Sequence, residues 1–142
     1  MKQEILSQLE ALFAKHPMLV AAPGTADEIG KIESYAGFAL PVDYRDFVTR
    51  FGGAVVGPYS VFGVGAAKAM GSGEDSVIRV TERFRSQRWP GCEQSLVVSM
   101  DHAGNPVTLD AHGCLRLHDH DDGRAEQVGT SFEDFLLRCL AA

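Results

Sequence analysis

Histidine and aspartate side chains gather in one short run near the C-terminal end of the chain. His118, Asp119, His120, Asp121 and Asp122 follow one another without interruption. Imidazole nitrogens and carboxylate oxygens are ligands that transition metals take. A metal site needs ligands that converge, however, and in a strand His118 and His120 share one face while Asp119 points to the other. The run therefore predicts a solvated acidic hairpin, and we expect neither a metal ion nor another cofactor.

Groups that could act as nucleophiles are present, but no recognisable motif arranges them. The sequence contains no G-x-S-x-G elbow, no P-loop and no dinucleotide fingerprint. Ser99, His102 and Asp110 could form a triad in principle, yet nothing in their local order brings them together. The three cysteines are odd in number and have no CxxC spacing, which argues against a disulfide framework or a zinc ribbon. We expect buried or half-buried thiols and a binding protein, not an enzyme.

A sheet is predicted to position the polar residues. Four short strands are expected at 96–100, 106–110, 114–118 and 126–129. The turns between them are short and rich in Gly, Asn and Asp, which favours an antiparallel meander. Alternation along these strands predicts one apolar face and one polar, outward face, on which we place Ser99 and Thr108 as well. The candidate partner-binding residues on and around this face are Asp101, Asp110, Arg116, His118 and His120, with Asp121 and Asp122 at its edge and Trp89 as a nearby anchor.

Helical periodicity supplies the remaining elements. Helices are predicted at 2–15, from a Thr25 cap to about Ala36, and then at 42–50, 75–88 and from a Ser131 cap onward. Two further strands are expected at 54–56 and 59–64, and a Gly- and Ala-rich loop at 65–73. The chain has 142 residues, which suits one domain spanning 1–142. The predicted fold is α+β, a mostly antiparallel central sheet of about six strands flanked by N-terminal helices, one middle helix and a C-terminal helix.

Charge is distributed unevenly along the chain. The net charge is −6, and residues 101–142 carry eight acidic against three basic side chains. An acidic surface disfavours nucleic acid as a partner and favours a basic protein surface. The N-terminus lacks the uninterrupted apolar core of a signal peptide, and no run approaches the ~18 apolar residues of a membrane span. We therefore expect a cytoplasmic protein with no membrane partner.

An ordered set of short motifs runs along nearly the whole chain. The N-terminal half contains Ala26-Asp27-Glu28-Ile29, Ile32-Glu33, Gly37-Phe38-x-Leu40-Pro41-x-Asp43-Tyr44-x-x-Phe47 and Gly52-Gly53. The C-terminal half contains Asp101-x-x-Gly104-Asn105, Leu109-Asp110, Gly113, Asp119-His120-Asp121 and Ser131-Phe132-x-x-Phe135-Leu136. Together these motifs resemble the SMI1/KNR4 family, also called the SUKH superfamily.

The resemblance implies both a fold and a role. It implies a central sheet flanked by helices and a function in binding other proteins. Many bacterial members are immunity proteins against secreted polymorphic toxins, often nucleases, and fungal members are regulatory scaffolds in cell-wall signalling. We therefore expect an immunity protein that occludes the active site of a cognate toxin domain acting in the cytoplasm, or alternatively an intracellular regulatory scaffold without a toxin partner. In either role we expect a monomer or a weak homodimer.

Overall fold

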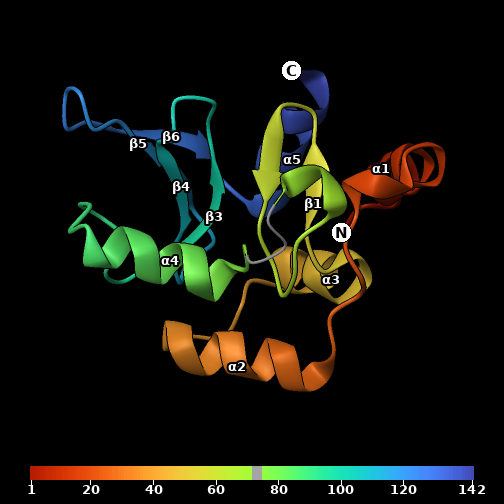
Figure 1. The fold of residues 1–142 in the computed structure, drawn as a ribbon, viewed down its shortest axis with the longest axis horizontal. Helices are drawn as coiled ribbons and strands as arrows, with labels where there is room; N and C mark the ends of the chain where they lie inside the picture. The colour runs from red at the N-terminus through yellow and green to blue at the C-terminus, as the bar shows by residue number, and fades with distance from the viewer. Residues whose placement is uncertain (72–74) are drawn as a thin grey trace.

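The computed structural model describes residues 1–71 and 75–142, and a single antiparallel sheet forms its centre (Figure 1). Within that part of the chain, six strands are arranged in sequence order, each antiparallel to its neighbours. They are β1 (Ala54–Val56), β2 (Tyr59–Val61), β3 (Leu96–Met100), β4 (Pro106–Leu109), β5 (Leu115–His118) and β6 (Ala125–Gly129). The short Gly- and Asp-rich turns thus produce the meander that they predict.

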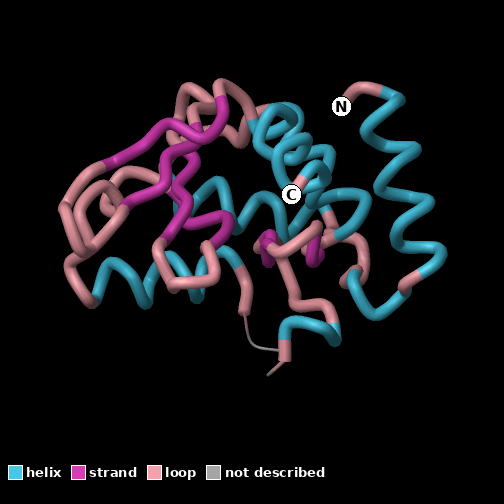
Figure 2. Tube along the Cα trace, turned by 90° about the horizontal axis from the view of Figure 1, so that it is seen from above, coloured by secondary structure: helices cyan, strands magenta, loops and turns pink. Residues whose placement is uncertain are grey.

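Helices occupy the positions that the apolar periodicity predicts. They are α1 (Gln3–Lys15), α2 (Ala26–Ala36), α3 (Val42–Phe51), α4 (Val77–Ser86) and α5 (Phe132–Ala141), with 3-10 turns η1 (Pro17–Leu19) and η2 (Lys68–Met70). Seen from above, the meander strands gather on one side of the molecule and α1 stands on the other (Figure 2). The α+β class is confirmed. No helix within residues 1–71 and 75–142 is long and apolar enough to cross a membrane.

Side-chain caps define the ends of the helices. The Thr25 hydroxyl accepts from the Glu28 N–H, while a Glu28 carboxylate oxygen accepts from the Thr25 N–H, which completes a capping box. Gly37 ends α2 with a φ of +80°, a conformation that glycine adopts without steric cost. The Ser131 hydroxyl accepts from the Asp134 N–H at the start of α5. All three signals are local in sequence, and this is why sequence patterns predict them correctly.

Strand β2 is shorter than the predicted 59–64. It leaves the ladder after Val61 because the chain turns away to make other backbone bonds. Val64 N–H donates to Gly52 C=O at 2.7 Å, and Gly63 C=O accepts from Val77 N–H at the start of α4. Of the loop predicted at 65–73, residues 72 and 73 lie outside the described residues.

The chain's own N-terminal segment closes the β1 edge of the sheet. Val20 forms a β-bridge with Ala54, and Ala21 N–H donates to Gly53 C=O at 2.9 Å. Gly52 has a φ of +73°, and a Cβ at this position would overlap a backbone carbonyl of the same segment. The Gly-Gly pair therefore lets two backbones approach closely, as expected for a turn that side chains would block.

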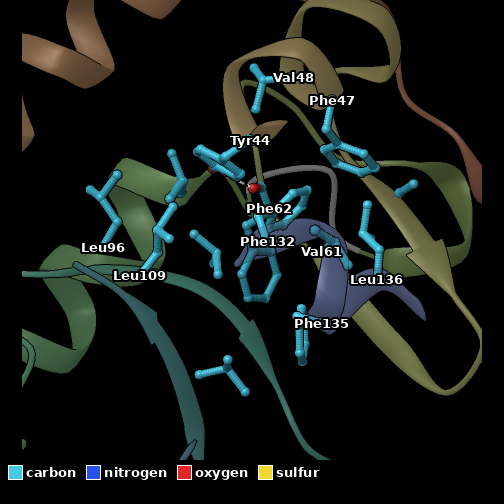
Figure 3. Close-up of a cluster of buried hydrophobic side chains, with 14 of the residues drawn as sticks. Tyr44, Phe47, Val48, Val61, Phe62, Leu96, Leu109, Phe132, Phe135 and Leu136 are labelled. Atoms are coloured by element: carbon cyan, nitrogen blue, oxygen red, sulfur yellow. Dashed lines mark hydrogen bonds between the residues drawn. The ribbon is translucent and has the colours of Figure 1, made fainter. Parts of the chain in front are cut away.

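The Tyr44 side chain lies at the centre of the core, where α3, α5 and the end of β2 meet (Figure 3). Its ring packs edge-on against Phe132 with centroids 5.0 Å apart, and its hydroxyl donates to the buried Phe62 carbonyl at 2.7 Å. Beside it, the Asp43 carboxylate accepts from Tyr44 N–H and from Glu133 N–H in the first turn of α5. Asp43 thus joins α3 to α5, and Pro41 takes the N-cap position of α3.

We predict that Tyr44→Phe lowers the free energy of unfolding by about 1–3 kcal/mol, because the buried Phe62 carbonyl loses its donor. Urea denaturation followed by circular dichroism measures the loss. Tyr59→Phe is the matched control, since the Tyr59 hydroxyl makes no hydrogen bond to the described residues and its ring is half-buried. Equal stabilities of the two variants would contradict the prediction.

Candidate protein-binding surface

The candidate residue Asp101 forms part of the turn between β3 and β4. Its carboxylate accepts from the N–H groups of Ala103 and Asn105, both at 2.9 Å, and from the Asn105 side-chain amide at 3.1 Å. Gly104 completes the turn with a φ of +84°. Aspartate favours such turns because its side chain can hydrogen-bond to backbone amides that follow it. The Asp101 carboxylate is therefore largely occupied by hydrogen bonds within its own turn.

Asp110 has the same role in the turn between β4 and β5. Its carboxylate accepts from the N–H groups of His112 and Cys114, and from the Arg116 guanidinium at 2.8 Å. Partial burial alone would raise the pKa of Asp110, but these hydrogen bonds outweigh it and hold the pKa below its usual value. Asp110 is thus ionised at neutral pH, with Arg116 neutralising it.

His118 lies on the predicted side of the sheet, but it is not exposed to solvent. Only 8% of its surface is accessible, and Thr108 beside it is buried as well. The His118 ring contacts the Thr108 hydroxyl at 2.8 Å and lies against Gly91. The prediction that Thr108 and His118 face solvent is wrong because α4 and the segment after it cover this side of the sheet.

Ser99 is also buried, and for a different reason. The pairing of β3 with β4 shifts register between Val97 and Ser99, so that Ser99 lies opposite Val107. An extra residue in one strand reverses the alternation beyond it. The Ser99 hydroxyl donates to the Ser60 carbonyl at 2.7 Å. The triad considered with His102 and Asp110 does not form, because those two residues follow opposite ends of the β3–β4 ladder.

A groove of about 640 Å³ lies between the polar side of β4 and β5 and the segment that follows α4. Its walls are formed by Arg88, Trp89, Pro90, Gly91, Glu93, Gln94, Ser95, Thr108, Asp110, Ala111, His112, Arg116 and His118. Arg85 of α4 fixes the outer wall by donating to the Cys92 carbonyl at 2.7 Å. Four of the candidate residues, Trp89, Asp110, Arg116 and His118, therefore line one groove.

Trp89 connects this groove to the β5–β6 hairpin. Its half-buried ring packs edge-on between Phe84 and His120, with centroid distances of 5.3 and 5.5 Å. His120 Nδ1 is 2.9 Å from the Asn105 side-chain oxygen, and its Nε2 is 3.1 Å from an Asp121 carboxylate oxygen. The indole thus serves as a lid over the core and as one end of the groove.

The His/Asp run is organised by its turn. Ligand-type atoms of Asp119, His120 and Asp121 lie within 4.8 Å of one another, at exposed or half-exposed positions. The Asp119 carboxylate accepts from Asp121 N–H, and the Asp122 carboxylate accepts from Arg124 N–H. These hydrogen bonds belong to an exposed acidic turn between β5 and β6, as predicted, but the three side chains converge, which the alternation of a strand does not predict.

The three cysteines are free thiols, two buried and one half-buried, as expected. Burial raises the pKa of Cys92 to about 11 and that of Cys139 to about 12. Thiols with such pKa values are protonated at neutral pH and are poor nucleophiles.

A family model described as SMI1-KNR4 cell-wall, SUKH_5, matches residues 2–141. The chain belongs to the SMI1-KNR4 family. Bacterial members are commonly immunity proteins, and the family typically consists of binding domains without catalytic activity. Comparison with curated proteins gives no match.

The structure gives physical roles to several SMI1-KNR4 motif residues. Asp101 and Asp110 cap turns, Gly52 permits a close backbone approach, and Tyr44 makes the central buried hydrogen bond. Those motifs maintain the fold. The groove walls come mainly from 88–95, a segment that carries none of the quoted motifs.

Sequence reasoning missed two residues that shape the surface of this SMI1-KNR4 domain, Gly91 and Asn105. Asn105 is predictable in part, because an Asn after Asp-x-x-Gly is placed to bond its own turn. Its side-chain oxygen also lies 2.9 Å from His120 Nδ1, in the next turn but one. The contact of Gly91 with His118 depends on a packing arrangement between distant segments. Local patterns carry no information about such contacts.

We predict that acid destabilises this SMI1-KNR4 protein partly through His118. Burial, aided by the positive charge of Arg116, lowers the pKa of the folded His118 ring below its ordinary value of 6.5. As pH falls through that ordinary value, the unfolded ring takes up a proton that the folded ring resists, so stability is lost. Between pH 7.5 and 5.5 the free energy of unfolding should fall more in the native protein than in His118→Gln. Equal losses would count against this assignment.

We also predict that Gly91→Ala lowers the free energy of unfolding by about 1–3 kcal/mol, because Gly91 has a φ of +81° and its Cβ would collide with the His118 ring. Gly123→Ala is the control, since Gly123 has a φ of +68° but no atom within 4 Å of the added Cβ. Thermal denaturation should show the larger loss for Gly91→Ala. A loss no larger than that of the control would show that the His118 contact is unimportant.

Proposed function

We propose that this protein is an immunity protein that binds a cognate toxin domain in the cytoplasm and blocks its active site. The supporting observation is its membership of the SMI1-KNR4 family across residues 2–141, since bacterial members are commonly immunity proteins. Such a protein neutralises its target by covering it, and it needs no catalytic residues, metal or cofactor of its own. A nuclease acting in the cytoplasm is the toxin class that best suits an acidic inhibitor.

The distribution of charge supports a basic target. Asp101 and Asp110 are used in turns, but Asp121, Asp122 and Glu126 project from the β5–β6 hairpin as exposed groups, with 83% of the Asp121 side chain accessible. Figure 1 shows this hairpin turn extending away from the helices at one end of the molecule. Nuclease active sites are basic because they hold phosphate. The hairpin therefore offers a negatively charged surface that such a site attracts.

The groove beside the hairpin supplies the second part of the proposed interface. Trp89 lies where the groove meets the hairpin, and tryptophan is often a major contributor to binding energy at interfaces. The Asp110–Arg116 pair is internally neutral, so the groove contributes shape and hydrogen bonds, and the hairpin contributes charge. We propose that Trp89, Arg116, His118 and His120 contact or support the toxin together with the acidic hairpin.

A second candidate function is an intracellular regulatory scaffold without a toxin partner. The name of the matching family refers to the cell wall, which favours this alternative. The genomic neighbourhood separates the two candidates. An adjacent gene for a secreted protein with a toxic C-terminal domain favours the immunity role.

We predict that co-expression of this protein with the toxin domain encoded by the neighbouring gene restores growth of a bacterial host, and that the two proteins co-purify. Trp89→Ala should weaken binding at least about 10-fold if Trp89 anchors the interface. Surface plasmon resonance against a catalytically inactive toxin domain measures the change. Toxicity that persists despite full expression of the protein would reject the immunity role.

We further predict that reversing charge at the hairpin, in Asp121→Lys with Asp122→Lys, slows association about 10-fold at low salt and less at high salt. Glu4→Lys with Glu10→Lys changes the net charge equally on the exposed side of α1 and is the matched control. Stopped-flow measurements at several salt concentrations separate steering from contact. If the hairpin variant and the α1 control variant associate with the toxin domain at the same rate, the hairpin does not steer the partner.

A further inference from the structure

The two edges of the sheet differ. The β1 edge is closed by Val20 and Ala21, as described above. Strand β6 is the last strand of the sheet, and Ala125, Glu126 and Gln127 are all exposed. No other strand among residues 1–71 and 75–142 pairs with its outer side.

The hydrogen bonds of the hairpins determine which β6 groups face outward. Asp119 N–H donates to Arg124 C=O at 2.9 Å, so these two residues form a hydrogen-bonded pair. Pairs in an antiparallel ladder alternate between bonded and non-bonded. His118 and Ala125 are therefore a non-bonded pair, and Glu126 bonds to the strand residue opposite it in β5.

The β4–β5 hairpin gives the same result independently. Asp110 N–H donates to Cys114 C=O, and alternation from that pair makes Arg116 bond to Thr108 in β4. The backbone groups of Arg116 thus face β4, and they cannot also bond to Gln127, which lies opposite Arg116 on the other side.

The alternation of hydrogen bonds in both hairpins leaves the N–H and C=O groups of Ala125 and Gln127 facing outward, away from β5. Neither residue hydrogen-bonds through its backbone to any other element in the described part of the chain. These four groups are spaced to pair with one additional antiparallel or parallel strand. Recognition of an extended segment by an exposed sheet edge is a recurrent mode of protein binding.

The charges around this edge select the kind of strand. Asp121, Asp122 and Glu126 are exposed at or beside it. Of the exposed bases nearby, Arg124 pairs with Asp122, and Arg116 on the neighbouring strand pairs with Asp110. A second copy of this chain fits poorly. Antiparallel pairing of two β6 strands through Ala125 and Gln127 would place Glu126 directly opposite Glu126, and like charges in that position are destabilising.

We propose that the β6 edge binds an extended segment of the partner protein as a seventh strand, and that this segment carries Lys or Arg opposite Glu126. The inference rests on the proposed function, because the partner is the toxin domain. Side chains of the added strand would alternate between the Glu126 side and the side of Arg116 and the groove. The edge would thus supply backbone pairing next to the surface formed by Trp89 and the hairpin.

Proline at position 127 tests the edge directly. Gln127→Pro removes an outward N–H and obstructs the approach of a strand, yet the β5–β6 ladder does not use this N–H. Gln127→Ala keeps the N–H and is the matched control. Against the catalytically inactive toxin domain encoded by the neighbouring gene, Gln127→Pro should bind at least about 30-fold more weakly, and Gln127→Ala within about 3-fold of the unsubstituted protein.

Hydrogen exchange of the unsubstituted protein gives a second measurement that does not depend on how Gln127→Pro folds. In the complex, NMR-detected exchange at the Ala125 and Gln127 amides should slow more than about 10-fold. The Glu126 amide is the internal control, because it is already bonded within the sheet. Glu126→Lys should weaken binding about 10-fold through charge repulsion.

The outcomes separate this inference from the proposed function. If the unsubstituted protein binds the toxin domain but Gln127→Pro binds equally well and the two amides exchange unchanged, the strand addition is wrong and the immunity role stands. If the unsubstituted protein binds no toxin, both are overturned. If sedimentation shows a dimer that Gln127→Pro converts to a monomer, the edge belongs to a second copy, and the basic partner strand is wrong.

Discussion

The buried hydrogen bond from the Tyr44 hydroxyl to the Phe62 carbonyl lies at the centre of the aromatic core. It connects a helix from the N-terminal third of the chain to the point where β2 leaves the sheet, and the Tyr44 ring also packs on Phe132 of α5. A buried carbonyl without a donor would be costly, so the alignment of α3 with β2 is narrowly constrained. Tyr44 and Phe47 of α3 meet Phe132 of α5 in this core (Figure 3). The groove lies elsewhere, on the polar side of β4 and β5.

The polar face shows how structural demands limit what remains for binding. Each hairpin after β3 uses an aspartate to bond the amides of its own turn. Asp110 is further neutralised by Arg116, and His118 is buried against Thr108. The negative charge that can attract a partner at long range is therefore concentrated at the β5–β6 hairpin, while the groove is close to neutral. The acidity of the C-terminal third thus overstates the acidity of the surface that a partner would meet.

Local patterns predicted most of the fold. The Thr25 cap and the Ser131 cap each depend on residues within a few positions, and both form as expected, as do six strands close to the predicted ranges. The exposure of His118 and Ser99 could not be predicted in the same way. Alternation tells which side of a sheet a residue occupies but not what covers that side, and a register shift between Val97 and Ser99 reverses the alternation itself. Likewise, the groove arises from packing between segments distant in sequence.

The closure of the β1 edge by the Val20 segment also limits how this protein can assemble. A sheet can polymerise through its edges only if both ends are available, since each subunit must both offer and accept a strand. Here one end is occupied internally and the other carries Glu126, which repels its own copy. Edge-to-edge growth of this sheet therefore stops at two copies, and the facing Glu126 side chains disfavour even that pairing.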